Sequence, residues 1–139
     1  MKVILLLLIY SLSDNDPSII DGWLPLQLPA DRITAFLESY EIEYTKNILY
    51  EQNSRVIHVT IEDNDYIYFV DRDLDLCFLV VKEYPSNQLP RRMRELDNWQ
   101  ESNVQELTWY NDTFALFRIV ASINTWEGRF SISYNAESR

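Results

Sequence analysis

The chain has 139 residues, and 22 acidic against 12 basic side chains give it a formal net charge of −10. This length predicts a single domain over residues 1–139, and a hydrophobic content of 47% excludes wholesale disorder. One cysteine excludes an internal disulfide framework and a cysteine-based metal cluster, and the acidity argues against direct nucleic-acid binding.

Residues 3–10 form a continuous apolar run, VILLLLIY, after Met1 and Lys2. A run of this length predicts a central strand that is buried on both faces. A secretion signal over residues 1–13 is the alternative, although it would be shorter than the usual roughly 15–30 residues. A membrane-spanning helix would need about 20 apolar residues. We therefore expect a cytoplasmic protein that does not bind a membrane.

Residues 11–29 contain three of the five prolines and one of the two glycines, a composition that predicts an irregular connection. A helix is predicted to begin at Pro29, since proline is well suited to a first helical turn. The apolar residues that follow it have helical spacing and form a single stripe: Ile33, Phe36, Leu37 and Tyr40.

The next section is predicted to contain strands. Residues 55–62 alternate apolar and polar side chains, which indicates a half-buried strand, and residues 66–70 and 74–81 follow it closely. Residues 76–81 are apolar on both faces, so this strand should be central in its sheet. Residues 43–51 form a less distinct strand.

A second helix is predicted from about Pro90, because Leu89, Met93 and Leu96 share one face. Three further strands are predicted at 104–110, 114–123 and 130–134, with tight turns at Asn111-Asp112 and Glu127-Gly128. This order predicts an α+β fold: a mainly antiparallel sheet of about six to eight strands with two helices packed on it.

The sequence offers little of the chemistry that an active site needs. Cys77 and His58 are the one thiol and the one imidazole, and Cys77 lies in an apolar run where an inert buried thiol is expected. His58 lies on the polar side of its strand, where a solvated role is expected. With only two glycines, no phosphate-binding loop is present. We therefore expect no catalytic residues, no enzyme activity and no cofactor.

The distinctive local feature is acidic. Six acidic residues and Arg72 give residues 62–75 a net charge of −5. Tyr66 and Tyr68 lie beside this cluster, and exposed tyrosines are favoured anchors in protein interfaces. The predicted partner-binding residues are Glu62, Asp63, Asp65, Tyr66, Tyr68, Asp71, Asp73 and Asp75. Solvated turn charge is the simplest interpretation of the carboxylates, and a basic protein partner is the functional one.

A calcium site is the other interpretation of this cluster. Asp71, Asp73 and Asp75 have the spacing that opens an EF-hand loop. The pattern then fails, because Leu76 stands where glycine is needed and Lys82 stands at the position of the bidentate glutamate. A looser site built from the same three carboxylates remains open, and calcium is the one candidate ion. The basic run Arg91, Arg92 and Arg94 is expected to be solvated or paired with the acidic hairpins.

The order of elements resembles that of the YbjN / type III secretion chaperone-like superfamily. The resemblance covers residues 31–123: a helix at 33–40, strands around 56–62, 66–70 and 74–82, a helix at 91–99, and two strands flanking Asn111-Asp112. The closing helix of such chaperones is absent, and the resemblance carries no diagnostic motif. It implies a small acidic protein-binding module without an active site.

These observations predict a non-enzymatic module of inhibitor, immunity or chaperone type. Its acidic surface would engage a basic protein partner by electrostatic steering, and it could do so by mimicking the charge of a nucleic acid. The alternative is a calcium-responsive binding protein that uses the carboxylates at 62–75. The sequence does not indicate an oligomeric state.

Overall fold

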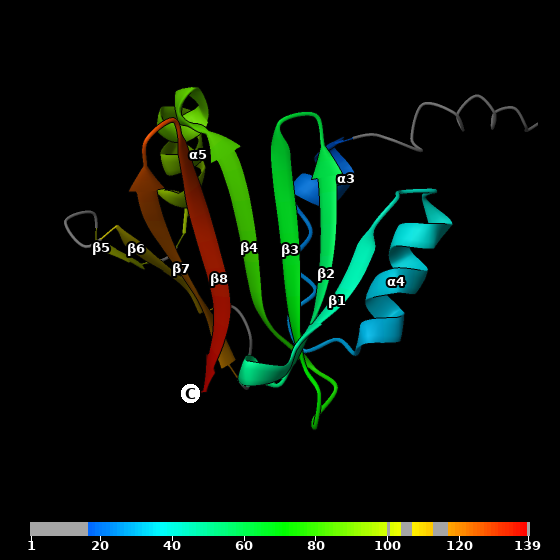
Figure 1. The fold of residues 1–139 in the computed structure, drawn as a ribbon. Coiled ribbons are helices and arrows are strands. Elements are labelled where there is room, and N and C mark those ends of the chain that lie inside the picture. The colour runs from blue at the N-terminus through cyan, green and yellow to red at the C-terminus, as the bar shows by residue number, and fades with distance from the viewer. Residues whose placement is uncertain (1–16, 100, 104–106, 113–116, 139) are drawn as a thin grey trace, which may run out of the picture.

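The computed structural model describes residues 17–99, 101–103, 107–112 and 117–138. Eight strands form one antiparallel sheet in the order β1-β2-β3-β4-β8-β7-β6-β5 (Figure 1). Together with the helices packed on it, this sheet confirms the predicted α+β class. The strand predicted at residues 3–10 lies outside the described residues. No helix of the described chain is both long and apolar enough to cross a membrane.

Among the described residues, three α-helices and two short 3₁₀ helices accompany the sheet: α3 (Pro17–Asp21), α4 (Ala30–Ser39), η1 (Tyr50–Gln52), η2 (Ser86–Gln88) and α5 (Leu89–Leu96). The helices predicted after Pro29 and near Pro90 are confirmed as α4 and α5. Helix α4 buries Ile33 and Leu37, two residues of the predicted stripe. The interpretation of residues 11–29 as wholly irregular is wrong, because they contain α3, which packs Ile20 into the core.

The strands are β1 (Thr45–Leu49), β2 (Ser54–Ile61), β3 (Asn64–Asp71), β4 (Cys77–Pro85), β5 (Glu101–Asn103), β6 (Thr108–Asn111), β7 (Phe117–Trp126) and β8 (Arg129–Ser138). Strand β4 begins three residues later than predicted. The reason is a local turn. The Asp71 carboxylate accepts hydrogen bonds from the backbone amides of Asp73 and Leu74, and these bonds hold residues 71–74 in a turn ahead of β4.

The last strand is inserted between distant parts of the chain. Strand β8 pairs with β7 through the two-residue turn Glu127-Gly128, as predicted, and Gly128 has the positive φ of +81° that such a turn favours. Its other edge pairs with β4, so that Ile132 lies opposite Lys82. This pairing joins the N-terminal strands β1–β4 to the C-terminal strands β5–β8.

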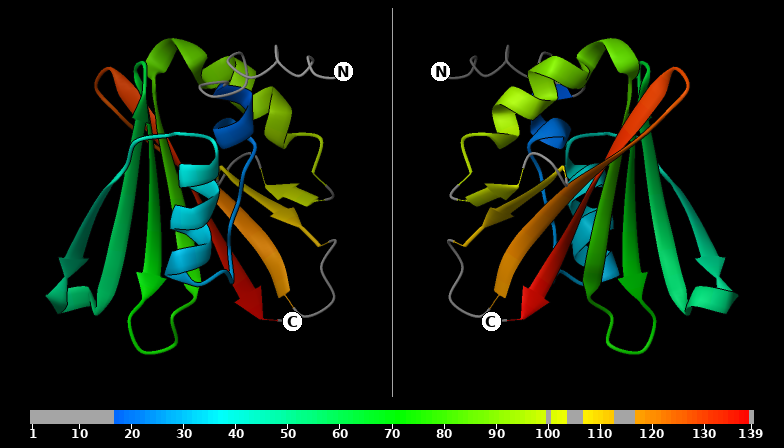
Figure 2. Two further views of the ribbon diagram at one scale, coloured as in Figure 1. Left: turned by 90° about the vertical axis from the view of Figure 1, so that its right-hand side faces the viewer. Right: turned by 90° about the vertical axis from the view of Figure 1, so that its left-hand side faces the viewer.

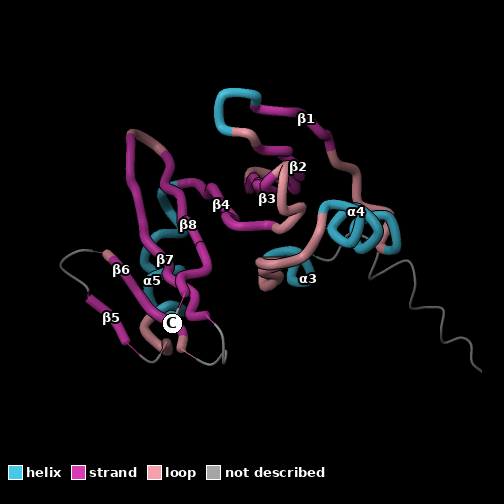
Figure 3. Tube along the Cα trace, turned by 90° about the horizontal axis from the view of Figure 1, so that it is seen from below, coloured by secondary structure: helices cyan, strands magenta, loops and turns pink. Residues whose placement is uncertain are grey.

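The sheet is strongly curved, and all three α-helices lie on one face of it, which we call the inner face (Figures 2 and 3). Side chains alternate between the two faces, so the register assigns Ile57, Tyr68 and Val80 to the inner face and Val56, Phe69 and Leu79 to the outer face. The three inner residues are buried at 1% exposure or less, and the three outer ones are half-buried. The core therefore lies between the inner face and the helices.

Candidate functional site

The acidic residues predicted to form one partner-binding surface are divided between the two ends of strand β3. Glu62, Asp63 and Asp65 lie at the β2–β3 turn, and Asp71, Asp73 and Asp75 lie at the β3–β4 connection (Figure 1). Since a strand rises about 3.3 Å per residue, the eight residues of β3 hold the two groups about 23 Å apart. The prediction of one continuous acidic cluster is therefore wrong.

The prediction that Tyr66 and Tyr68 are exposed anchors is also wrong. Both side chains are fully buried on the inner face of β3. They occupy alternate positions, and the alternation of a strand places every second residue against the core. Neither tyrosine can contact a partner on the surface of the folded domain.

At the β2–β3 turn, Asp65 is engaged by three neighbours within the chain. His58 Nε2 lies 2.9 Å from its Oδ1 atom, Thr60 Oγ1 donates to the same oxygen at 2.7 Å, and Arg129 Nη2 donates to Oδ2 at 3.1 Å. Partial burial tends to raise the pKa of Asp65, but the hydrogen bonds from Thr60 and His58 lower it below its usual value. Arg129 therefore partly neutralises this end, and His58 is held by Asp65 while its side chain stays 41% exposed.

At the β3–β4 connection, each carboxylate holds a different part of the backbone or a different side chain. Asp71 accepts from the amides of its own turn, Asp73 accepts from Asn53 Nδ2 at 2.8 Å, and Asp75 accepts from the Ala30 amide at the start of α4 at 3.2 Å. The three carboxylates are thus directed at separate partners. No group of three His, Cys, Asp or Glu side chains within the described ranges is placed to hold a metal ion.

The same end of the sheet exposes apolar side chains. The 3₁₀ helix η1 lies beside the β3–β4 connection: the Arg72 amide donates to the Asn53 carbonyl at 3.0 Å, and the Arg72 guanidinium lies 5.1 Å from the centre of the Tyr50 ring. Tyr50 and Leu74 are each 72% exposed. We call this surface, comprising residues 49–53 and 71–76, the tip.

The tip continues into an apolar region of the outer face. Phe78 is 39% exposed and its ring lies 6.4 Å from that of Phe69. Around this pair, half-buried aliphatic side chains occupy neighbouring outer positions on β2, β3 and β4: Val56, Ile67, Leu79 and Val81. No helix of the described chain covers this face (Figure 2). It offers a partner an apolar contact next to the carboxylates of the tip.

The thiol and the imidazole are not brought together. His58 lies on the outer face, since it pairs with Ile67, whereas Cys77 pairs with Val70 on the inner face. Cys77 is fully buried, and this burial raises the pKa of its thiol to about 12. The expectation of an inert buried thiol agrees with this environment.

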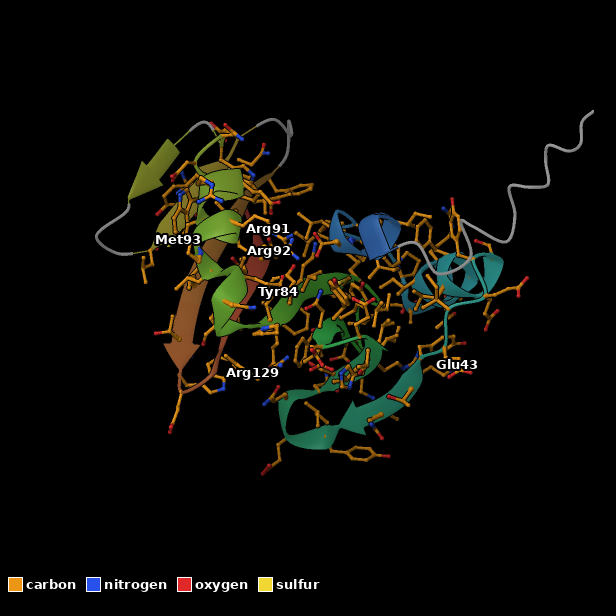
Figure 4. All side chains as sticks on the ribbon, turned by 90° about the horizontal axis from the view of Figure 1, so that it is seen from above. Glu43, Tyr84, Arg91, Arg92, Met93 and Arg129 are labelled. Atoms are coloured by element: carbon orange, nitrogen blue, oxygen red, sulfur yellow. The ribbon has the colours of Figure 1, made fainter. Side chains whose placement is uncertain are left out.

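The inner face carries a polar cluster that the sequence analysis missed. Asp21, the last residue of α3, accepts hydrogen bonds from the hydroxyls of Tyr66 and Tyr84 at 3.0 Å each and from Arg92 of α5. Arg92 is 6% exposed, and its guanidinium lies 3.9 Å from the centre of the Tyr84 ring (Figure 4). Arg92 is therefore paired with Asp21, not with the acidic hairpins.

Lys82 completes this cluster from the centre of β4. It is 2% exposed, its ammonium donates to the backbone carbonyl of Asp21, and its Nζ atom lies 5.1 Å from the centre of the Tyr134 ring. Burial lowers the pKa of Lys82 to about 8. A signal was present in the sequence, because Val80, Lys82 and Tyr84 occupy every second position of one strand. Residues two apart share a face of the sheet, so a lysine between two core residues is predicted to face the core.

The polar cluster borders a pocket, which can be compared with a second one. The first, about 450 Å³, lies between α3, α5 and the inner face and is lined by Lys82, Arg92, Trp99, Ile132 and Tyr134 among others. The second, about 620 Å³, lies between α4 and strands β1 and β2. Its ionisable side chains are Asp31, Lys46, Arg55 and Asp75, and none of them is buried. Of these two pockets in the described part of the chain, the first combines a cavity with a buried charge.

No family model matches this chain, and neither the curated proteins nor the solved structures contain one that matches it. The resemblance to the YbjN / type III secretion chaperone-like superfamily therefore stays a prediction.

Proposed function

We propose that this chain is a non-enzymatic protein-binding module that engages a basic protein partner through the tip and the adjoining outer face. The observation that carries the proposal is the exposure of Tyr50 and Leu74, at 72% each, among the carboxylates of Glu51, Asp71 and Asp73. The two side chains lie on the two segments of the tip and adjoin the apolar region of the outer face, and apolar patches rimmed by polar groups mark interaction sites.

The chemistry of this surface resembles that of a protein interface. An aromatic ring and neighbouring aliphatic groups form an apolar centre, and charged groups form its rim. The tip contains four carboxylates against one arginine. A partner with basic side chains around an apolar contact would therefore complement it in charge, and the net charge of −10 would speed the encounter at low salt.

The proposal keeps the inhibitor, immunity and chaperone types together, since each requires only a surface of this kind. It replaces the buried Tyr66 and Tyr68 of the sequence prediction by Tyr50 and Leu74, and it retains Asp71, Asp73 and Asp75. No observation favours the calcium alternative, because those three carboxylates are directed at different partners within the fold.

Affinity capture from native lysate at low salt tests the proposal with three variants of the full chain. Tyr50→Ser with Leu74→Ser removes the apolar centre, and Glu51→Gln with Asp73→Asn removes charge from the rim. Glu62→Gln with Asp63→Asn removes the same charge from the opposite end and serves as the matched control. We expect the control to retain the wild-type partner, the rim variant to weaken binding, and the apolar variant to lose it.

Salt dependence supplies an independent readout. Surface charge interactions are screened over about 10 Å at 0.1 M salt, so capture should decline as salt rises. Capture of the same protein by the wild type and all three variants would overturn the assignment to the tip. Capture of nothing by the wild type would overturn the proposed function.

A further inference from the structure

The pocket on the inner face contains the buried ammonium of Lys82, which contacts no carboxylate among the described residues directly. Within the described part of the chain, Lys82 forms no ion pair, and its one hydrogen bond goes to the backbone carbonyl of Asp21. A buried charge is ordinarily paired, because the desolvation of an isolated ammonium costs several kcal/mol. Apart from this carbonyl, the described residues offer the ammonium only the face of the Tyr134 ring, with its centre 5.1 Å from Nζ.

The nearest carboxylate is already committed to other groups. Asp21 accepts from Arg92, Tyr66 and Tyr84, which accounts for both of its oxygens. Arg92 is likewise committed, since Gln88 Oε1 accepts from its Nε at 3.2 Å and from its Nη2 at 2.9 Å. The pocket therefore has one cationic donor to offer a ligand, and that donor is Lys82.

The pocket has a charged side, formed by Asp21, Lys82, Arg92 and Glu95, and an apolar and aromatic side. On the apolar side, Trp99 and Tyr134 pack with their ring centres 6.0 Å apart, next to Leu24, Leu96 and Ile132. A volume of about 450 Å³ falls within the range of small-molecule sites, in which a few polar groups orient a ligand within apolar walls. A buried ammonium beside an apolar side favours a ligand with one negative charge and an apolar body.

We propose that this pocket binds a small monocarboxylate whose carboxylate pairs with Lys82 and whose apolar body packs on Trp99 and Tyr134. A dianion such as phosphate fits less well, because Asp21 and Glu95 also line the pocket and would repel a second charge. This site lies on the opposite face of the sheet from the outer apolar region, so it is independent of the proposed protein-binding function.

Calorimetric titration of the full chain with phenylacetate tests the proposal, with phenylacetamide as its neutral isostere. Octanoate provides an aliphatic monocarboxylate of different shape. Loss of a charge-assisted hydrogen bond should weaken binding about tenfold to a hundredfold, so we expect phenylacetate or octanoate to bind and the amide to bind at least tenfold more weakly. Inorganic phosphate should bind more weakly than the carboxylate.

The variant Lys82→Met should reduce carboxylate affinity to that of the amide, whereas Lys46→Met, which alters an exposed lysine in the other pocket, should not change it. Circular dichroism establishes whether each variant is folded. The comparison of phenylacetate with phenylacetamide uses the wild-type chain and does not depend on the variants. Failure of both carboxylates to bind below about 5 mM, equal binding of acid and amide, or tighter binding of phosphate would each overturn the proposal.

Discussion

Arg92 of α5 donates a hydrogen bond to the carboxylate of Asp21, the last residue of α3, and this ion pair joins the two helices over the inner face of the sheet. Burial disfavours the charged form of each partner. Burial of the Asp21 carboxyl would raise its pKa, but the hydrogen bond and charge of Arg92 bring it below its usual value. Desolvation likewise opposes the charge of Arg92, yet the bond to Asp21 raises its pKa. The two groups stabilise each other in a place where neither would be stable alone.

Breaking this pair should be costly. We expect Arg92→Met to lower the free energy of unfolding by about 3 kcal/mol, because it removes the guanidinium partner of the half-buried Asp21 carboxylate. Arg91→Met is the matched control: Arg91 is exposed, so its loss should change stability by less than about 0.5 kcal/mol. Urea denaturation of both variants measures the difference, and equal losses would contradict a structural role for the ion pair.

The buried Lys82 should make stability depend on pH. Its pKa is about 8 in the folded protein, against an ordinary value of 10.5, so the unfolded chain binds more protons between these values. Raising the pH from about 8 to 10 should therefore stabilise the wild type relative to Lys82→Met, by up to about 3 kcal/mol. Tyrosine and cysteine titrations occur in both proteins and cancel in the difference. Denaturation curves across this window measure it, and a difference independent of pH would show that Lys82 is not desolvated.

Loss of the hydroxyl should affect the stability of the protein differently at two buried tyrosines. Tyr84 donates to Asp21 at 3.0 Å, whereas the Tyr68 hydroxyl is buried without a hydrogen-bond partner among the described residues. Tyr84→Phe should lower the free energy of unfolding by about 2 kcal/mol, since a bond to a charged group is lost. Tyr68→Phe should leave it unchanged or raise it by up to about 1 kcal/mol. A comparable loss in Tyr68→Phe, measured by thermal unfolding, would imply a partner for that hydroxyl.

The single thiol should report on unfolding. Cys77 is fully buried, and its pKa of about 12 leaves very little reactive thiolate at pH 8. We expect iodoacetamide to modify the native protein at least about a hundredfold more slowly than the protein denatured in urea. Mass spectrometry over a time course measures both rates, and rapid modification of the native protein would contradict the burial of β4.

The acidic residues at the two ends of β3 should differ in their effect on folding. Asp75 caps α4 by accepting from the Ala30 amide, and loss of a helix cap costs about 1 kcal/mol. Asp75→Ala should therefore lower stability by about this amount. Asp63→Ala, which removes an exposed carboxylate at the opposite end, should change it by less than about 0.5 kcal/mol. If chemical denaturation gives the same midpoint for both variants, the contact with Ala30 does not support α4.

Local patterns predicted most of the secondary structure. The stripe of α4 and the alternation of β2 follow from spacing alone, because a helix or strand must turn its apolar side toward the core. The same reasoning missed α3, whose five residues are too few to establish a period. It also placed the start of β4 too early, because the turn at Asp71 is held by side-chain hydrogen bonds that no periodicity reveals.

The candidate sites were less accessible to sequence reasoning. The acidic residues at 62–75 stand out in the sequence, but nearness in sequence does not place them together in space, because strand β3 separates them into two groups. The sequence does not show which side of β3 faces the core, because Tyr66 and Tyr68 alternate with Ile67 and Phe69 and both pairs are apolar. The prediction that the tyrosines are exposed therefore had no support from the alternation. The exposed pair at the tip, Tyr50 and Leu74, belongs to turns and carries no periodic signal.

The sequence by itself determined the net charge of −10, the α+β class and the absence of a phosphate-binding loop, because these depend on composition and on patterns that repeat every two to four residues. Only the tertiary structure decided that the charge is divided between two ends of β3, and that Asp21, Lys82 and Arg92 meet over the inner face. Those contacts join residues up to 71 positions apart. Pairing at such separations is fixed by the order of strands and the packing of helices, which no local pattern encodes.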